Sequence, residues 1–283
     1  GAALATKISA ALLLVSIGAA VAADYVLLFI RQPHKPEHYL PHLPLFLTRL
    51  STHLFLILIL CASTFLILEP YSLIDFRTFL SQTIEQSHMT KSAFTFPYTL
   101  QYVFKTPYLY ELKNILLFGQ GPVLSFLTLS GILLLSLHAM IKKKHGAWAK
   151  EFILVIYFWT YFIIVGSFAI GFMRYMLPVY PILCIAGAFF VSQGVSFFPS
   201  LQKKQFSIVL GSTLFLLLLI WPLSFMRIYQ TTNTRIQATD WILSYIPKGS
   251  TLAIEHWDDA LPLHSQANYQ TLTLPLYDQD TPQ

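Results

Sequence analysis

A single cation, Arg174, lies in a long apolar stretch of the chain. Between Glu151 and Lys203 no other side chain carries a formal charge. A charge in apolar surroundings is costly unless something compensates it, so such a residue is a functional-site hypothesis by default. A guanidinium group donates paired hydrogen bonds, which suits a phosphate. We therefore predict that Arg174 binds a phosphate group. The alternative is that it only anchors the chain at lipid headgroups.

Two prolines follow Arg174 in the stretch 169-AIGFMRYMLPVYPIL-183. Pro178 and Pro181 suit the first turn of a helix, where a missing N–H costs no intrahelical hydrogen bond. We therefore expect the N-terminus of the following helix to lie beside Arg174. Its free N–H groups and positive dipole end would then add to the guanidinium and form an anion site.

A second segment, 96-FPYTLQYVFKTPYLYELKN-114, is rich in tyrosine. Tyrosine favours the headgroup layer of a membrane, so an interfacial belt is one interpretation. The alternative is a pocket for a polar lipid or a sugar, because two amide side chains in the segment add hydrogen-bond partners. The candidate residues are Tyr98, Gln101, Tyr102, Tyr108, Tyr110 and Asn114.

Acidic residues are candidates for substrate contact in two other regions. Glu69 and Asp75 follow an apolar stretch, where a carboxylate can orient an acceptor hydroxyl or bind a metal. Asp75 can equally cap a helix, which we favour. Glu111 is expected to pair with Lys113 or with water. Near the C-terminus lies a polar cluster of Glu255, His256, Asp258, Asp259 and His264.

Three interpretations remain open for this C-terminal cluster. Its residue types can bind a divalent metal, but their spacing matches no standard site. The cluster can instead contact substrate. The simplest interpretation is an acidic loop that follows a strand, so no metal or other cofactor is assigned.

The composition is that of an integral membrane protein. The 283 residues are 55% hydrophobic and 11% charged, with a mean hydropathy of +0.59, whereas soluble domains contain about 25% charged residues. The net charge of +5 comes with no basic stripe between aromatic residues, so no nucleic-acid partner is predicted. The chain begins GAALATK, without Met or a basic signal-peptide region, and we interpret it as a piece of a longer protein.

Six stretches are apolar and long enough to span a membrane as helices. They are 8–30, 50–68, 114–140, 152–171, 176–196 and 206–226. Lys and Arg are concentrated in the loops after the first, third and fifth stretches, which are therefore predicted to be cytoplasmic. The 69–113 loop, the Arg174 turn and the tail from Arg227 then face the periplasm, the cell exterior or an organelle lumen.

The outer loop and the tail also have predicted structure. The apolar spacing over 73–89 predicts a helix that lies in the outer interface or packs on an outer domain of the protein. In 227–283 we expect a capped helix that ends at 247–249 and a strand at 251–254, the start of a small α/β unit that we take to be incomplete. The predicted fold is thus a mostly α, polytopic transmembrane helix bundle over 1–226 with an extracytoplasmic α/β segment over 227–283.

Four segments in order carry a resemblance to known enzymes. The pattern R-Y-x-L-P-x-Y-P begins at Arg174, and GAALATK at 1–7 resembles the start of a middle helix in the same group. QYVFKTPYLYELKNILLFGQG at 101–121 resembles an outer-loop pattern, and AIEHWDDALPL at 253–263 resembles a segment after the last span. The chain is similar to membrane glycosyltransferases of the GT-C fold that use phospholipid-carried sugars, such as protein O-mannosyltransferases and the aminoarabinose transferases of lipid A.

The resemblance implies a specific activity. A sugar would pass, with inversion, from a polyprenyl-phosphate or polyprenyl-diphosphate donor to a hydroxyl of a protein, lipid or glycan at the outer face of a bacterial inner or plasma membrane. Arg174 would hold the donor phosphate, and Tyr175 with Tyr102 or Tyr108 would line the pocket. The acidic general base of the family lies in an outer loop that precedes this chain, so no residue here is assigned to it.

The rival hypothesis is a transporter or lipid flippase in which Arg174 binds the translocated anion. Transporters tend to show internal repeats and interrupted helices at the membrane midplane. No repeat is visible in this sequence, and the polar residues gather at one surface, so the enzyme is favoured. A ligase or polymerase of the O-antigen type, which shares the lipid-phosphate chemistry, is a third possibility.

Overall fold

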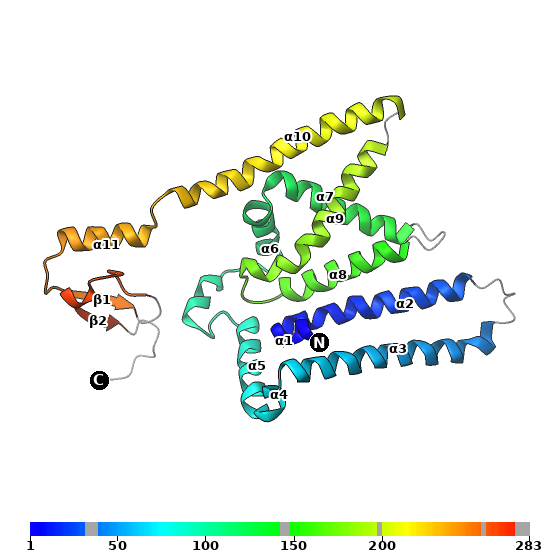
Figure 1. Cartoon of the computed structure of the whole chain (residues 1–283), viewed down its shortest axis with the longest axis horizontal. Helices are drawn as coiled ribbons and strands as arrows, with labels where there is room; N and C mark the ends of the chain where they lie inside the picture. The colour runs from blue at the N-terminus through cyan, green and yellow to red at the C-terminus, as the bar shows by residue number, and fades with distance from the viewer. Residues whose placement is uncertain (32–38, 142–147, 197–199, 256–258, 275–283) are drawn as a thin grey trace. The chain divides into compact units, whose positions relative to one another are not determined.

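The protein is mostly helical and forms two units, Gly1–Leu214 and Phe215–Gln283 (Figure 1). The computed structural model describes residues 1–31, 39–141, 148–196, 200–255 and 259–274, and 78% of it is helix. Within these residues, four helical stretches are long and apolar enough to cross a membrane, namely Leu47–Leu68, Pro122–Ile141, Met173–Ser196 and Lys204–Tyr245. The predicted helical class and its compatibility with a membrane are confirmed, and the count of six spans stays a prediction.

The first unit begins with two short helices, α1 (Ala2–Thr6) and the 3-10 helix η1 (Ile8–Leu12). They lead into α2 (Leu13–Arg31), which packs antiparallel against α3 (Tyr39–Leu68) in Figure 1. No residue in the most apolar window of α3 is buried, as expected of a helix whose surroundings are apolar.

The predicted interfacial helix is present as α4 (Tyr71–Ile74) and α5 (Phe76–Lys91). Three apolar side chains of α5, Phe76, Leu80 and Ile84, are 55%, 42% and 47% exposed. The described part of the chain does not cover this face. The face is available to a membrane interface or to an outer domain, and both interpretations stay open.

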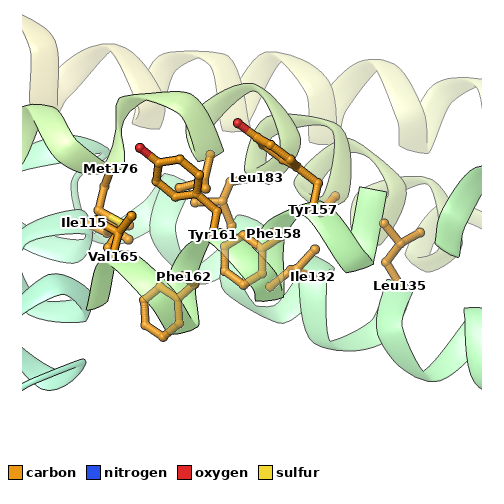
Figure 2. Packing of buried hydrophobic residues seen from close by; sticks show 12 residues of the cluster. Ile115, Ile132, Leu135, Tyr157, Phe158, Tyr161, Phe162, Val165, Met176 and Leu183 are labelled. Carbon is orange, nitrogen blue, oxygen red and sulfur yellow. The ribbon is translucent and has the colours of Figure 1, made fainter. Parts of the chain in front are cut away.

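The packed centre of the first unit consists of α7 (Pro122–Ile141), α8 (Trp148–Gly166) and α9 (Tyr180–Ser196). Figure 2 shows its buried side chains, among them Phe158 and Tyr161 of α8 and Leu183 of α9. Helices α7 and α9 approach closely at Gly131, where an added Cβ atom would clash with the carbonyl oxygen of Ala186. Small residues permit such close approach of apolar helices.

One predicted span boundary is wrong. The stretch 114–140 was expected to be one helix, but the chain forms α6 (Leu109–Asn114), a π-helical turn η4 (Ile115–Gly119) and then α7 from Pro122. The break is at Gly121, whose φ of 76° is readily adopted only by glycine, and proline at the first helical position then starts α7. The residues 119–122, Gly-Gln-Gly-Pro, are a turn signal in the sequence that the span prediction from hydrophobicity passed over.

The second unit contains the end of α10 (Ser200–Met226), the 3-10 helix η6 (Arg227–Gln230), α11 (Thr234–Tyr245), β1 (Thr251–Glu255), η7 (Gln266–Asn268) and β2 (Gln270–Leu274). The cap, helix and first strand are as predicted: Asn233 Oδ1 accepts a hydrogen bond from the Arg235 N–H at 2.8 Å. Strand β2, which was not predicted, pairs in parallel with β1. The buried Tyr269 hydroxyl donates to carbonyls of α11 and so fixes the helix against the sheet.

Candidate functional site

Arg174 lies in the 3-10 helix η5 (Met173–Val179), after a loop that follows α8. The loop is tied to the end of α5, because the Ala169 N–H donates to the Thr90 carbonyl at 2.7 Å. Arg174 is exposed, and its guanidinium carbon lies 4.7 Å from the centre of the Phe172 ring. It has no acidic partner among the residues that the structure describes. Its hydrogen-bond donors are therefore available to an anion.

The helical stretch Met173–Ser196 begins one residue before Arg174, but its first part is the 3-10 helix η5. The α-helix α9 begins only at Tyr180, after the rest of η5. Pro178 lies inside η5 and Pro181 is the second residue of α9. Pro181 therefore lies in the first turn of α9, as predicted. Pro178 does not, because proline is compatible with a 3-10 turn as well as with the start of an α-helix. The anion site expected from free N–H groups beside Arg174 stays a prediction.

A second cation, Lys7, lies at the same place and was not singled out from the sequence. Its ammonium nitrogen is 5.1 Å from the centre of the Tyr175 ring. Within the described residues Lys7, like Arg174, has no carboxylate partner. Two cations on the faces of adjacent aromatic residues, with no neutralising acid, form an electropositive surface that suits an anion.

The rings that hold these cations form one aromatic cluster, which comprises Tyr98, Tyr102, Tyr110, Phe172 and Tyr175. The Phe172 ring is edge-to-face with Tyr102 at 5.3 Å and with Tyr175 at 5.5 Å. Tyr102 also meets Tyr110 edge-to-face at 5.9 Å. Such edge-to-face pairs fix the mutual orientation of the rings. The cluster joins the tyrosine segment to the Arg174 segment, as the pocket hypothesis requires.

Tyr102 is the buried member of the aromatic cluster, and its hydroxyl stays protonated. Burial, followed by the neighbouring Tyr110, Tyr175 and Glu111, raises the pKa of Tyr102 to about 12, although Arg174 acts in the opposite direction. Its phenol is therefore a neutral hydrogen-bond donor at physiological pH, and it does not serve as a base.

The remaining residues of the tyrosine segment are placed differently. Tyr98 is partly exposed, with its ring 6.5 Å from that of Phe172, and Gln101 Nε2 donates to the Tyr98 carbonyl at 2.9 Å. Tyr108 instead packs on α8: its backbone N–H donates to Gly166, and its ring lies 5.9 Å from Phe162. Of these three, the structure brings only Tyr98 to the aromatic cluster.

A buried ion pair that the sequence analysis missed lies beside the aromatic cluster, with Lys105 Nζ 5.6 Å from the centre of the Tyr110 ring. Lys105 Nζ is 2.8 Å from Glu111 Oε1, and both side chains are 1% exposed. The contact is an ion pair by distance, without the geometry of a hydrogen bond. The expected partner of Glu111, Lys113, is two positions along the same helix, and residues so spaced face different directions. That prediction is therefore wrong.

Asn114, one helical turn after Glu111, is buried as well. Its Nδ2 atom has no hydrogen-bond partner within the described chain, and neither does Glu111 Oε2. No contact that the structure describes joins Asn114 to the aromatic cluster. Its predicted contact with substrate stays a prediction.

Glu69 and Asp75 lie at the other end of the outer loop, at the start of α4 and α5. The Asp75 carboxylate accepts a hydrogen bond from the Thr78 N–H at 3.3 Å and caps α5, so the capping prediction is confirmed. No described contact joins either carboxylate to the aromatic cluster. Their predicted role toward an acceptor or a metal stays a prediction.

The acidic cluster of the C-terminal tail is only partly described. Glu255 is exposed at the end of β1, and the exposed Asp259 pairs with Arg235 at 3.8 Å. His256 and Asp258 lie outside the described residues. Within the described part of the chain, no group of three or more metal-ligand side chains is close enough to hold an ion.

Lys7, Lys105 and Phe172 are the site residues that sequence reasoning missed. A signal existed for the two lysines, because each is the only cation in an otherwise uncharged part of its motif segment. Nothing in the sequence indicated which aromatic ring each cation would face. Comparison with protein-family models, characterised proteins and solved structures finds no match to this chain.

Proposed function

We propose that the protein is a membrane glycosyltransferase that moves a sugar from a polyprenyl-phosphate-linked donor to a hydroxyl of a protein, lipid or glycan. One observation carries the proposal. Three segments far apart in the sequence, each part of a motif that resembles lipid-dependent glycosyltransferases, meet at the aromatic cluster. They contribute Lys7, the pair Tyr102 and Tyr110, and Arg174 with Tyr175.

The charges of this cluster support an anionic ligand. The Arg174 guanidinium carbon lies 4.7 Å from the centre of the Phe172 ring, and a guanidinium group can bind a phosphate with two hydrogen bonds. Lys7 adds a second positive charge beside Tyr175. As the bond between sugar and phosphate breaks, negative charge grows on the leaving phosphate, and fixed cations stabilise that charge most in poorly solvated surroundings.

The apolar residues around Arg174 support a lipid-borne ligand rather than a soluble one. Met173 and Leu177, on either side of Arg174 in η5, are 44% and 57% exposed. The same segment continues into α9, one of the stretches apolar enough to enter a membrane. A phosphate carried by a polyprenyl chain can present its charge to Arg174 while its tail stays among apolar side chains. We place the site on the outer side of an inner or plasma membrane, as the resemblance and the distribution of Lys and Arg among the loops imply.

The test uses the full-length protein purified in nanodiscs with polyprenyl-phosphate sugars as donors. Arg174→Ala is expected to lower kcat by about 10²–10³-fold, the usual loss when one donor to a developing negative charge is removed. Arg174→Lys is expected to recover only part of the rate, because an ammonium group lacks the paired donors of a guanidinium. Transfer is measured as labelled sugar that appears in the acceptor.

The matched control is Arg77→Ala, which removes another exposed cation, from α5. It is expected to leave transfer unchanged. Equal transfer by wild type and Arg174→Ala would remove Arg174 from the mechanism. No transfer from any lipid-linked sugar, together with flux of a substrate across vesicles, would establish the transporter instead.

A further inference from the structure

The buried ion pair is connected to the loop that carries Arg174. Besides Glu111, Lys105 Nζ donates hydrogen bonds to the carbonyl oxygens of Phe168 at 2.8 Å and Ile170 at 3.0 Å. These carbonyls lie only a few residues before Arg174. Lys105 therefore joins the tyrosine segment to the Arg174 loop across more than sixty positions of sequence.

The contacts of Lys105 account for the conformation of this loop. Buried carbonyl groups need hydrogen-bond donors, and Lys105 supplies one to each of two alternate residues. A fully buried ammonium group needs a counter-charge, which Glu111 provides. The loop packs tightly on the pair, since an added Cβ atom at Gly171 would lie 2.7 Å from Glu111 Oε1 and 2.8 Å from the Tyr110 ring.

The loop in turn fixes the aromatic ring on which Arg174 rests. Phe172 directly follows Gly171, and its ring is held edge-to-face by Tyr102 and Tyr175. If the Phe168 and Ile170 carbonyls lost their donor, this part of the loop would be free to move. The ring under the guanidinium would then move with it.

We propose that Lys105 is a positioning residue for Arg174, with Glu111 as its counter-charge. Lys105 does not bind the donor itself, because its side chain is 1% exposed and its nitrogen already has three oxygen partners. It holds the 168–172 loop so that Phe172 and Arg174 face the ligand. This inference rests on the proposed function for its activity test and is independent of it for its structural test.

The activity test replaces both members of the pair in the full-length protein, as Lys105→Met together with Glu111→Leu. Removing both charges leaves neither group buried alone, so the fold is expected to be retained. Misplacement of a catalytic group by about 1 Å can cost about 10²-fold in rate, so kcat is expected to fall by up to about that factor. In an Arg174→Ala background the same double substitution is expected to cost less than about twofold, because residues that act through one another are not additive.

The structural test follows hydrogen exchange of the amides of residues 168–175. In wild type the Ala169 amide is hydrogen-bonded to Thr90 and the Tyr175 amide to Phe172. The double variant is expected to exchange these amides at least about tenfold faster, while those of α9 are unchanged. The matched control is Glu85→Leu with Lys91→Met, which removes two exposed charges from α5 and is expected to change neither exchange nor rate.

A second variant keeps the inference testable if the double variant does not fold. Glu111→Gln removes only the counter-charge, and Lys105 can still donate to both carbonyls. The exchange of residues 168–170 is then expected to stay within about twofold of wild type, although the midpoint of thermal unfolding falls.

The outcomes separate this inference from the proposed function. Unchanged exchange in a folded double variant would overturn the positioning role. The positioning role would also be overturned if the double substitution lowered the rate by the same factor in the Arg174→Ala background as in wild type. Faster exchange in the double variant, combined with full transfer by Arg174→Ala, would leave the loop contacts established and overturn the role of Arg174 in the proposed function.

Discussion

Two cations close together in this protein, Lys105 and Arg174, have opposite surroundings. Lys105 is 1% exposed, pairs with Glu111 and donates to two carbonyls. Arg174 is exposed, lies on the face of one aromatic ring and has no acid beside it in the part of the chain that the structure describes. The first cation is satisfied by the protein and the second is available to a ligand. A buried charge with partners is evidence for architecture, and an unpaired one at a surface is evidence for binding.

The same distinction applies to the carboxylates. Glu111 is buried and paired, whereas Asp75 is exposed and caps a helix. Both therefore have a structural explanation, and neither is placed by a described contact to act on an acceptor hydroxyl. The cations of the aromatic cluster have no such explanation. The site is thus defined by its positive charges.

Glu111→Leu is expected to have the largest effect on stability. It leaves the Lys105 ammonium buried without its counter-charge, and breaking a buried pair in this way costs about 3–5 kcal/mol. Unfolding in detergent, followed by circular dichroism against denaturant, measures the change. The control Glu85→Leu, at an exposed position on α5, is expected to change stability by less than about 0.5 kcal/mol. Equal effects of the two substitutions would show that the pair is not buried in solution.

Gly171→Ala is expected to cost about 1–3 kcal/mol by overpacking. The new methyl group would meet Glu111 Oε1, which Lys105 holds in place, and the Tyr110 ring. The same unfolding measurement applies, with Gly194→Ala as control because nothing lies within 4 Å of an added Cβ atom there. A neutral Gly171→Ala would mean that the 168–172 loop is loosely packed on the ion pair.

Asp75→Ala is expected to destabilise the protein by about 0.5–2 kcal/mol through loss of the α5 cap. Asp75→Asn is expected to be neutral, because asparagine caps a helix as well as aspartate does. If capping is the whole role of Asp75, the asparagine variant also retains full sugar transfer. A loss of transfer without a loss of stability would restore Asp75 as a substrate residue.

The pH dependence of stability tests the burial of Tyr102. Its pKa is about 12 in the folded protein and 10.0 in an unfolded chain, so the folded state holds this proton more tightly. The contribution of this proton to the free energy of unfolding is complete below pH 10.0 and is lost as the pH rises toward about 12. Over this range, the free energy of unfolding of wild type minus that of Tyr102→Phe is expected to fall, because the variant has no group to ionise at this position. A pH-independent difference would contradict the burial of the hydroxyl.

Arg174→Ala and Lys7→Ala are expected to have the smallest effect on stability, within about 0.5 kcal/mol of wild type. Both side chains are exposed, and neither forms an ion pair with a residue that the structure describes. Binding of a vesicle-borne polyprenyl phosphate should nevertheless weaken in each variant. A large loss of stability would show that these cations are structural, like Lys105, and would remove the contrast.

Several local features follow from the sequence because short-range physics decides them. The cap at Asp75, the cap at Asn233 and the strand from Thr251 each depend on residues a few positions apart, and all three are present. The break at Gly121 also has a local cause and a local signal, the Gly-Gln-Gly-Pro run at 119–122, but the span was predicted from hydrophobicity alone and the signal was missed. Hydrophobicity identifies a span and does not locate the turn that interrupts it.

The site was predicted only in part, because sequence shows residue types and spacing but not contacts between distant segments. The isolated charge of Arg174 and the tyrosine segment are visible in the sequence. The helical stretch beside Arg174 begins as a 3-10 helix and not as an α-helix, since that choice depends on what packs around the prolines. The partner of Glu111 was wrong too, because the nearest cation in sequence, Lys113, is not the nearest in space.

From its amino acids alone this chain is recognisable as apolar, mostly helical and compatible with a membrane, and one arginine stands alone in a long uncharged stretch. Composition and spacing suffice for such properties because each depends on the residue and its close neighbours. Which cations have partners and which do not depends on the packing of the whole chain. It paired Lys105 with Glu111, and it placed Lys7 and Arg174 on rings from one cluster. Those contacts join segments remote in sequence, and only the packing of the helices brings them together.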